Sequence, residues 1–202
     1  MQQPVHHAIC RAPRRRTITL RLGAWLTCLL LLSSLLNARG PAAPETKPTE
    51  FEVEAAYLFE FGKFVGWPGT QTDASFVICV LGEDPFGSVL DRTIAGETLR
   101  GRPVQDKRIA RPQDATACSI LYISSSESAR LSKILSVIQE APVLTVSDIP
   151  EFVQQGGMIQ FVLREGRVRF EVNLAPARRN GLAMSSELLK VAVEVVRGRG
   201  SD

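Results

Sequence analysis

The feature that most constrains this chain is the alternation of short apolar runs with helix-like segments. Residues 76–81, 120–123 and 143–146 have the length and apolar character of buried strands, and the alternating run 104–109 is a weaker strand candidate. Because strands that alternate with helices form parallel sheets, the sequence predicts an α/β fold. We expect a single domain whose mostly parallel sheet is covered by helices.

Helix start signals lie between these runs. A capping box opens a predicted helix over 49–65, and a second capping box opens one over 124–138. Asp84 is placed to cap a third helix. Two more helices are expected, one after Pro176 and one over 186–196.

The C-terminal part is predicted to contain an antiparallel hairpin. Its arms, 158–163 and 167–174, flank the three-residue turn Arg164-Glu165-Gly166, in which glycine suits a left-handed conformation. Polar side chains alternate with a buried row in the second arm, and we expect them to form part of a partner-binding or ligand-binding surface: Arg169, Glu171 and Asn173. The alternative is a polar strand face that contacts only water.

Residues 1–38 have the layout of a signal peptide, a basic segment followed by a Leu-rich segment, with cleavage expected at about 38–43. A Pro/Ala-rich spacer over 39–48, the α/β domain over 49–197 and a polar tail over 198–202 follow. An uncleaved membrane anchor is the alternative. In both cases the positive charge before the apolar segment predicts that the domain is exported.

The charge of the exported part argues against nucleic acid as a partner. Residues 1–40 hold six of the 24 basic residues and no acidic one, so the remainder carries 18 basic against 21 acidic residues. Without a basic patch this part has no electrostatic footprint for nucleic acid. Both histidines, His6 and His7, also lie in the leader, which removes His-based triads, His-ligated zinc and His acid–base catalysis.

Candidate polar groups lie where the predicted parallel strands end, which is the default ligand site of an open α/β sheet. The chain has Gly82-Glu83-Asp84, Ser124-Ser125-Ser126 and Ser147-Asp148 at these ends. Serines without a base are ordinarily helix caps, and acidic pairs are common at helix starts. No phosphate-binding loop, dinucleotide fingerprint or nucleophile elbow is found. The sequence therefore favours binding over catalysis: we expect no enzyme activity, no cofactor and no metal site.

Cys79 and Cys118 are the two cysteines of the predicted domain. One lies inside an apolar strand run and the other at the entry of the next, and an exported protein meets oxidising conditions. We predict an intramolecular disulfide, with two buried free thiols as the alternative. Because there is no C-x-x-C motif, a redox-catalytic role is disfavoured.

Aromatic residues crowd the first predicted helix and its exit, and they do not follow one stripe. The helix should therefore be covered on more than one side. One interpretation is a core helix. The other is a dimer or partner interface, with four candidate residues: Tyr57, Phe61, Phe64 and Trp67.

Several strings of the domain resemble the YfiR family of exported proteins, and they occur in that family's order. They are EAAYLFEFGKFVGWP at 54–68, PVLTVSD at 142–148, GGMI at 156–159, VRFEVNL at 168–174, and the segment 182–189. The resemblance covers about residues 50–196. It also implies a disulfide between Cys79 and Cys118.

The resemblance implies a homodimeric periplasmic regulator that binds the periplasmic sensor domain of an inner-membrane diguanylate cyclase. Such binding would repress the cyclase and lower cyclic di-GMP and biofilm formation. An outer-membrane lipoprotein that sequesters some members is a second implied partner. Some relatives carry a second cysteine pair where this chain has Val153 and Gln160, so a switch that depends on that pair is not expected here. The alternative function is periplasmic small-molecule sensing or solute binding, paired with another membrane sensor or transporter.

Overall fold

The computed structural model describes residues 47–69 and 75–197. The predicted signal peptide and nearly all of the predicted spacer and polar tail lie outside the described residues. No helix in the described part of the chain is both long enough and apolar enough to cross a membrane.

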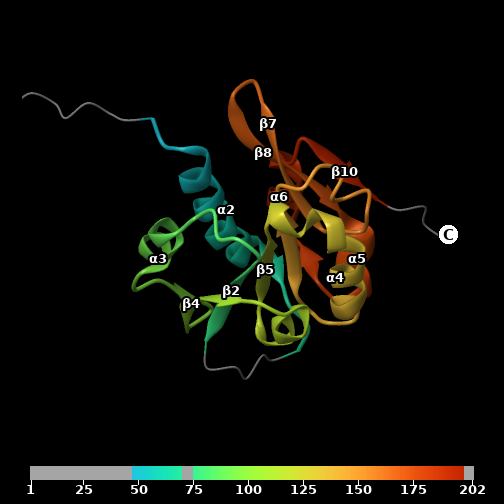
Figure 1. The fold of residues 1–202 in the computed structure, drawn as a ribbon, viewed down its shortest axis with the longest axis horizontal. Coiled ribbons are helices and arrows are strands. Elements are labelled where there is room, and N and C mark those ends of the chain that lie inside the picture. The colour runs from blue at the N-terminus through green and yellow to red at the C-terminus, as the bar shows by residue number, and fades with distance from the viewer. Residues whose placement is uncertain (1–46, 70–74, 198–202) are drawn as a thin grey trace, which may run out of the picture. The chain divides into compact units, whose positions relative to one another are not determined.

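An eight-stranded sheet organises the described residues, with the strand order β10-β8-β7-β6-β5-β2-β4-β3 (Figure 1). β2 pairs in parallel with β4 and β5, and the parallel ladder continues through β6 to β7. β8 then pairs antiparallel with β7 as a hairpin, and β10 pairs in parallel with β8. The predicted fold class, an α/β domain with a mostly parallel sheet and a C-terminal hairpin, is confirmed.

The strands of this sheet are β2 (Phe76–Leu81), β3 (Thr98–Leu99), β4 (Arg102–Ile109), β5 (Ile120–Ile123), β6 (Leu144–Ser147), β7 (Ile159–Arg164), β8 (Arg167–Asn173) and β10 (Glu194–Val196). A separate two-stranded antiparallel pair joins β1 (Val65–Gly66) to β9 (Ala183–Met184). The α-helices are α2 (Glu50–Phe64), α3 (Ser88–Ile94), α4 (Leu131–Ile138), α5 (Leu174–Arg179) and α6 (Ser186–Val191), and the 3-10 helices are η1 (Pro112–Ala117) and η2 (Ser125–Arg130).

Both faces of the sheet are covered, which explains the continuous apolar runs in the sequence. Along β2, Ile78 and Val80 contribute to a core shared with α2 and α3, whereas Cys79 and Leu81 contribute to a second core shared with α4. Figure 1 shows α2 and α3 on one side of the strands and α4 on the other. A Cβ atom at Gly62 would lie only 2.4 Å from the side chain of Leu99, so glycine allows α2 to approach the sheet closely.

The first helix follows its sequence signals. Thr49 and Glu52 form the predicted capping box, in which the Glu52 backbone N–H donates to the Thr49 hydroxyl and the Glu52 carboxylate accepts from the Thr49 backbone. The helix ends at Phe64, one residue before the predicted end, because Val65 starts β1.

One predicted helix start was wrong, and one predicted helix is divided. Asp84 does not cap α3, which begins at Ser88; its carboxylate instead accepts from the Phe86 backbone at 2.9 Å and from Arg108 at 2.8 Å. The helix predicted over 124–138 is divided into η2 and α4. Its supposed capping residue, Glu127, forms an ion pair with Arg130 instead of bonding back to the start of the helix.

Two further predictions near the C-terminus were wrong. The hairpin turn has two residues, because Arg164 pairs directly with Arg167, and both Glu165 and Gly166 have positive φ. The last predicted helix, over 186–196, ends at Val191, and β10 follows it. β10 completes the edge of β8, where the backbone N–H of Val193 donates to the carbonyl of Phe170 at 3.0 Å. β-branched residues fit this extended edge better than a helix.

Candidate functional site

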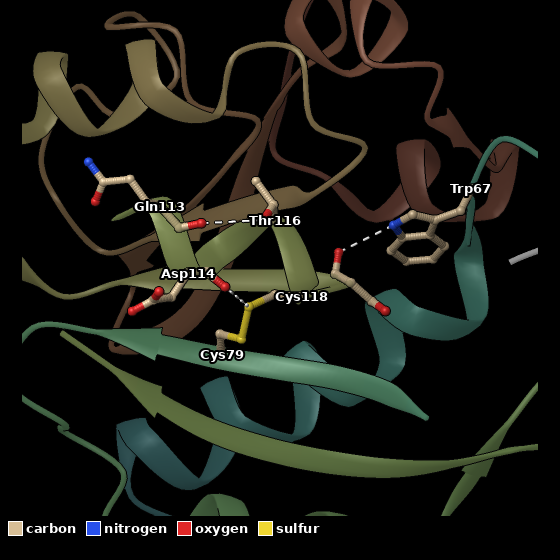
Figure 2. Close-up of a disulfide and its surroundings, with 7 residues drawn as sticks. Trp67, Cys79, Gln113, Asp114, Thr116 and Cys118 are labelled. Atoms are coloured by element: carbon tan, nitrogen blue, oxygen red, sulfur yellow. Dashed lines mark hydrogen bonds between the residues drawn. A yellow bond between two sulfur atoms is a disulfide. The ribbon is translucent and has the colours of Figure 1, made fainter. Parts of the chain in front are cut away.

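The disulfide predicted from the sequence is present. Cys79 on β2 and Cys118, just before β5, are bonded, with Cα atoms 5.9 Å apart (Figure 2). The parallel pairing of β2 with β5 brings together two residues that are 39 positions apart in the chain. Both side chains are buried in the α4-side core, so the bond is a structural crosslink.

Trp67, at the exit of α2, is fixed by contacts inside the chain. Its indole N–H donates to the carbonyl of Ser119 at 3.2 Å (Figure 2). The indole meets the ring of Phe76 edge to face, with centroids 5.1 Å apart, and the guanidinium of Arg100 lies 5.8 Å from the indole centroid. Trp67 is half-buried and anchors the end of α2.

Tyr57 and Phe61 belong to an aromatic cluster between α2 and the hairpin. Their rings stack with centroids 5.8 Å apart, and both contact Phe161 on β7 and Phe170 on β8. Phe61 is only 1% exposed. It is therefore a core residue of this chain.

An apolar groove of about 280 Å³, here called the α2–α6 groove, lies beside this aromatic cluster. Phe64 is 38% exposed in it, and Val191 of α6 is 58% exposed. Its lining residues come from α2, β8 and α6: Tyr57, Glu60, Phe61, Phe64, Phe170, Glu187, Leu188 and Val191. The structure thus brings three predicted interface residues to one groove and leaves Trp67 outside its lining.

The polar residues predicted on β8 are not equivalent. Arg169 is exposed, whereas Glu171 and Asn173 are buried. The Glu171 carboxylate accepts from Arg164 at 3.2 Å. Asn173 donates through Nδ2 to the carbonyl of Val153 at 2.7 Å and accepts from the backbone of α5 through Oδ1. Of the three, Arg169 is the residue that faces solvent.

Of the serines at the carboxyl end of β5, Ser124 acts as a helix cap, as predicted. The hydroxyl of Ser124 accepts from the backbone of Ser126 at 3.4 Å at the start of η2. The hydroxyl of Ser126 in turn accepts from the backbone of Glu83 at 3.0 Å. The bond between Glu83 and Ser126 connects the segments that follow β2 and β5.

A buried acidic cluster lies near the same strand ends and is formed by Glu54 on α2, Tyr122 on β5 and Asp148 after β6. Glu54 is 1% exposed and Tyr122 is fully buried. Glu54 Oε2 is buried without a hydrogen-bond partner in the described part of the chain, whereas the Tyr122 hydroxyl lies within reach of the Asp148 carboxylate. The sequence analysis named Asp148 but missed Glu54 and Tyr122. One signal could have found Glu54, which stands at the head of the apolar helical row that continues with Leu58 and Phe61.

Burial, followed by the negative charges of Asp148 and Glu50, raises the pKa of Glu54 to about 8. Burial and the charge of Asp148 also raise the pKa of Tyr122 well above its ordinary value. This shift favours the protonated, neutral form of Glu54. Within residues 47–69 and 75–197, no group of three or more His, Cys, Asp or Glu side chains is arranged to hold a metal ion.

The sheet order and the two covered faces define a mixed α/β sheet domain, and comparisons with known proteins give its family. The YfiR/HmsC-like family model matches residues 51–193, so the chain belongs to the YfiR/HmsC-like family. This is a regulatory, non-catalytic family of periplasmic proteins. Membership supports, at the level of the family, a periplasmic regulator of a diguanylate cyclase. The buried disulfide fits an oxidising compartment.

Two solved structures match part of this chain. One is the crystal structure of a conserved domain protein from Vibrio cholerae O1 biovar El Tor, with a TM-score of 0.50 and 11% identity, covering 74% of this chain and 61% of that one. The other is the ABC domain from Streptococcus pneumonia in complex with L-Trp, with a TM-score of 0.49 and 12% identity, covering 70% of this chain and 60% of that one. The chain thus spans about three fifths of the solved chains that it matches.

Proposed function

We propose that this protein is a non-enzymatic repressor that binds the periplasmic sensor domain of an inner-membrane diguanylate cyclase. Bound to that domain, it lowers cyclic di-GMP signalling and biofilm formation. The proposal refines the role of the family to a particular mechanism, stoichiometric binding of a membrane partner.

The observation that carries this proposal is the half-exposed ring of Phe64 in the α2–α6 groove. Aromatic residues that are partly exposed in an apolar recess are typical anchors of protein interfaces. The neighbouring Val191 extends the apolar surface, and Glu60 and Glu187 give it polar margins. An apolar centre with a polar rim is the usual composition of a protein-binding surface.

Gene deletion tests the function. Loss of the repressor should raise cyclic di-GMP and biofilm mass in the host, and the rise should disappear when the target cyclase is deleted as well. An unchanged cyclic di-GMP level in the single deletion would contradict the cyclase assignment.

Complementation of that deletion tests the groove. Phe64→Asp should fail to restore repression, whereas Phe51→Asp should restore it, because Phe51 is 39% exposed on the same helix but does not line the groove. Val191→Asp and Val137→Asp form a second matched pair, since Val137 is 37% exposed on α4. Equal repression by all four variants, at equal protein levels, would remove the groove from the interface.

A homodimer and a sequestering outer-membrane lipoprotein are part of the same proposal. Light scattering on the purified protein gives its mass, and a monomer at micromolar concentration would contradict the dimer. Co-expression of the lipoprotein should raise cyclic di-GMP only when the repressor is present.

A pocket lined by both polar and apolar residues favours small-molecule sensing as a second candidate function. It has a volume of about 230 Å³ and lies between α4, α5 and the turn before β7. Arg179, Gln139 and Ser132 are among its lining residues and suit a small anion. Calorimetric titration with small carboxylates, and with Arg179→Ala as control, would test this function.

A further inference from the structure

The buried acidic cluster of Glu54, Tyr122 and Asp148 supports an inference that does not depend on the proposed function. Glu54 is 1% exposed, and its Oε2 atom is buried with no partner among the described residues. Burying an ionised carboxylate without a cation is far more costly than burying a neutral acid. In the folded chain the negative charge of Glu54 must therefore be neutralised, and binding of a proton is the simplest way.

The charged groups that act on Glu54 are acidic. Glu50 lies one turn before it on α2, and Asp148 faces it from the segment after β6. Tyr122 of β5 adds a buried, neutral hydroxyl beside Asp148 and no positive charge. The field around Glu54 therefore favours its neutral form.

The charged groups of α3, which packs against α2, have partners of their own. On α3, Arg92 donates to Ser88 and acts on Glu52, and Asp91 forms an ion pair with Arg108. None of these contacts involves Glu54.

The strand β8 and the helix α6 also pack against α2. β8 contributes the apolar Phe170 and Val172 to the core under α2, and its Glu171 pairs with Arg164. On α6, Glu187 lines the α2–α6 groove together with Glu60 and Phe64, and it is acidic.

We propose that Glu54 is a proton-binding site that fastens α2 to the sheet, and that alkaline conditions loosen this helix by removing the proton. Loosening α2 would also disturb the α2–α6 groove, because Tyr57, Phe61 and Phe64 lie on the same helix. A protein outside the cytoplasm would thereby respond to the pH of its surroundings.

The direction of the effect follows from proton linkage. The pKa of Glu54 is about 8 in the folded chain against an ordinary value of 4.5. Between these values the folded chain holds a proton that the unfolded chain has released. The stability that this proton provides is complete below about pH 4.5 and is lost as the pH rises to about 8.

The test compares the melting temperature of the wild type with that of Glu54→Gln from pH 5 to pH 9. The amide of this variant imitates the protonated acid, so the two proteins should differ little at pH 5, and the variant should be more stable by at least about 5 °C at pH 8.5. Glu97→Gln is the control, because Glu97 is exposed, and it should follow the wild type. At pH 8.5, amides of Glu50–Phe64 should exchange faster in the wild type than in Glu54→Gln.

The remaining outcomes overturn the proposal. A difference between wild type and Glu54→Gln that is the same at pH 5 and pH 8.5 would show that no proton is released in this range. If added Ca²⁺ or Mg²⁺ stabilises EDTA-treated wild type but not Glu54→Gln, the cation at the site is a metal. Tyr122→Phe keeps both carboxyl groups, so its melting temperature should keep the pH dependence of the wild type. If the pH dependence disappears in this variant, the titrating group is not Glu54.

Discussion

The ring of Phe61 on α2 stacks on the ring of Phe161 on β7, with centroids 5.9 Å apart and planes inclined by 21°. This contact joins the first helix of the described chain to the C-terminal hairpin, 100 residues later in the sequence. Phe61 and Phe64 therefore have different roles. Both line the α2–α6 groove, but Phe61 is 1% exposed and packs in the core, whereas Phe64 is 38% exposed.

Truncation of these two phenylalanines should therefore have different consequences. Phe61→Ala should lower the free energy of unfolding by about 3–5 kcal/mol, since it leaves a cavity in the aromatic cluster. Phe64→Ala should lower it by less than about 1.5 kcal/mol and should reduce association with the cyclase sensor domain instead. Chemical denaturation and co-purification measure the two effects. Equal loss of stability in both variants would make Phe64 a core residue.

The disulfide should stabilise the chain without taking part in chemistry. Closing a loop of this length contributes about 4 kcal/mol in the chain-entropy model. The double variant Cys79→Ala, Cys118→Ala should therefore unfold at a lower denaturant concentration and keep its repressor activity wherever it remains folded. Mass spectrometry of the unreduced protein provides the direct check, and alkylation of Cys79 and Cys118 without reduction would disprove the bond.

The buried polar residues of β8 should behave as structural residues. Asn173→Ala removes the bond to the Val153 carbonyl and the cap of α5, and we expect a loss of about 2–4 kcal/mol. Glu171→Lys should also destabilise, because it places a second cation beside Arg164 in a buried position. Arg169→Ala is the exposed control and should change stability by less than about 0.5 kcal/mol. Urea unfolding of the three variants measures these effects, and unchanged stability of Asn173→Ala would contradict the role given to its two bonds.

The edge strand β10 should depend on backbone pairing at Val193. Val193→Pro removes the N–H that donates to Phe170, and we expect a loss of about 1–3 kcal/mol. Val193→Thr keeps this N–H and a β-branched side chain, so it should remain close to the wild type. Thermal unfolding of the pair distinguishes the two cases, and equal melting temperatures would argue against the pairing of β10 with β8.

The parallel strands, the capped first helix and the hairpin could be predicted from the sequence, because their signals are local. Apolar runs, the capping box of Thr49 and Glu52, and the turn glycine Gly166 act within a few residues of one another. The disulfide could also be predicted, since Cys79 and Cys118 lie in or beside strand runs. The sequence did not predict the α2–α6 groove. It indicated only that the first helix carries more aromatic residues than one stripe accommodates.

Which groups meet one another depends on the tertiary structure. Glu54, Tyr122 and Asp148 are distant in sequence and converge because β5 and β6 are neighbours and α2 packs on one face of the sheet. The valines after Val191 became a strand because the edge of β8 offered free backbone groups, although the same residues had suggested a helix. Burial likewise changed Glu171 and Asn173 from surface candidates to internal contacts, because strand alternation gives the face of a residue but not what covers that face.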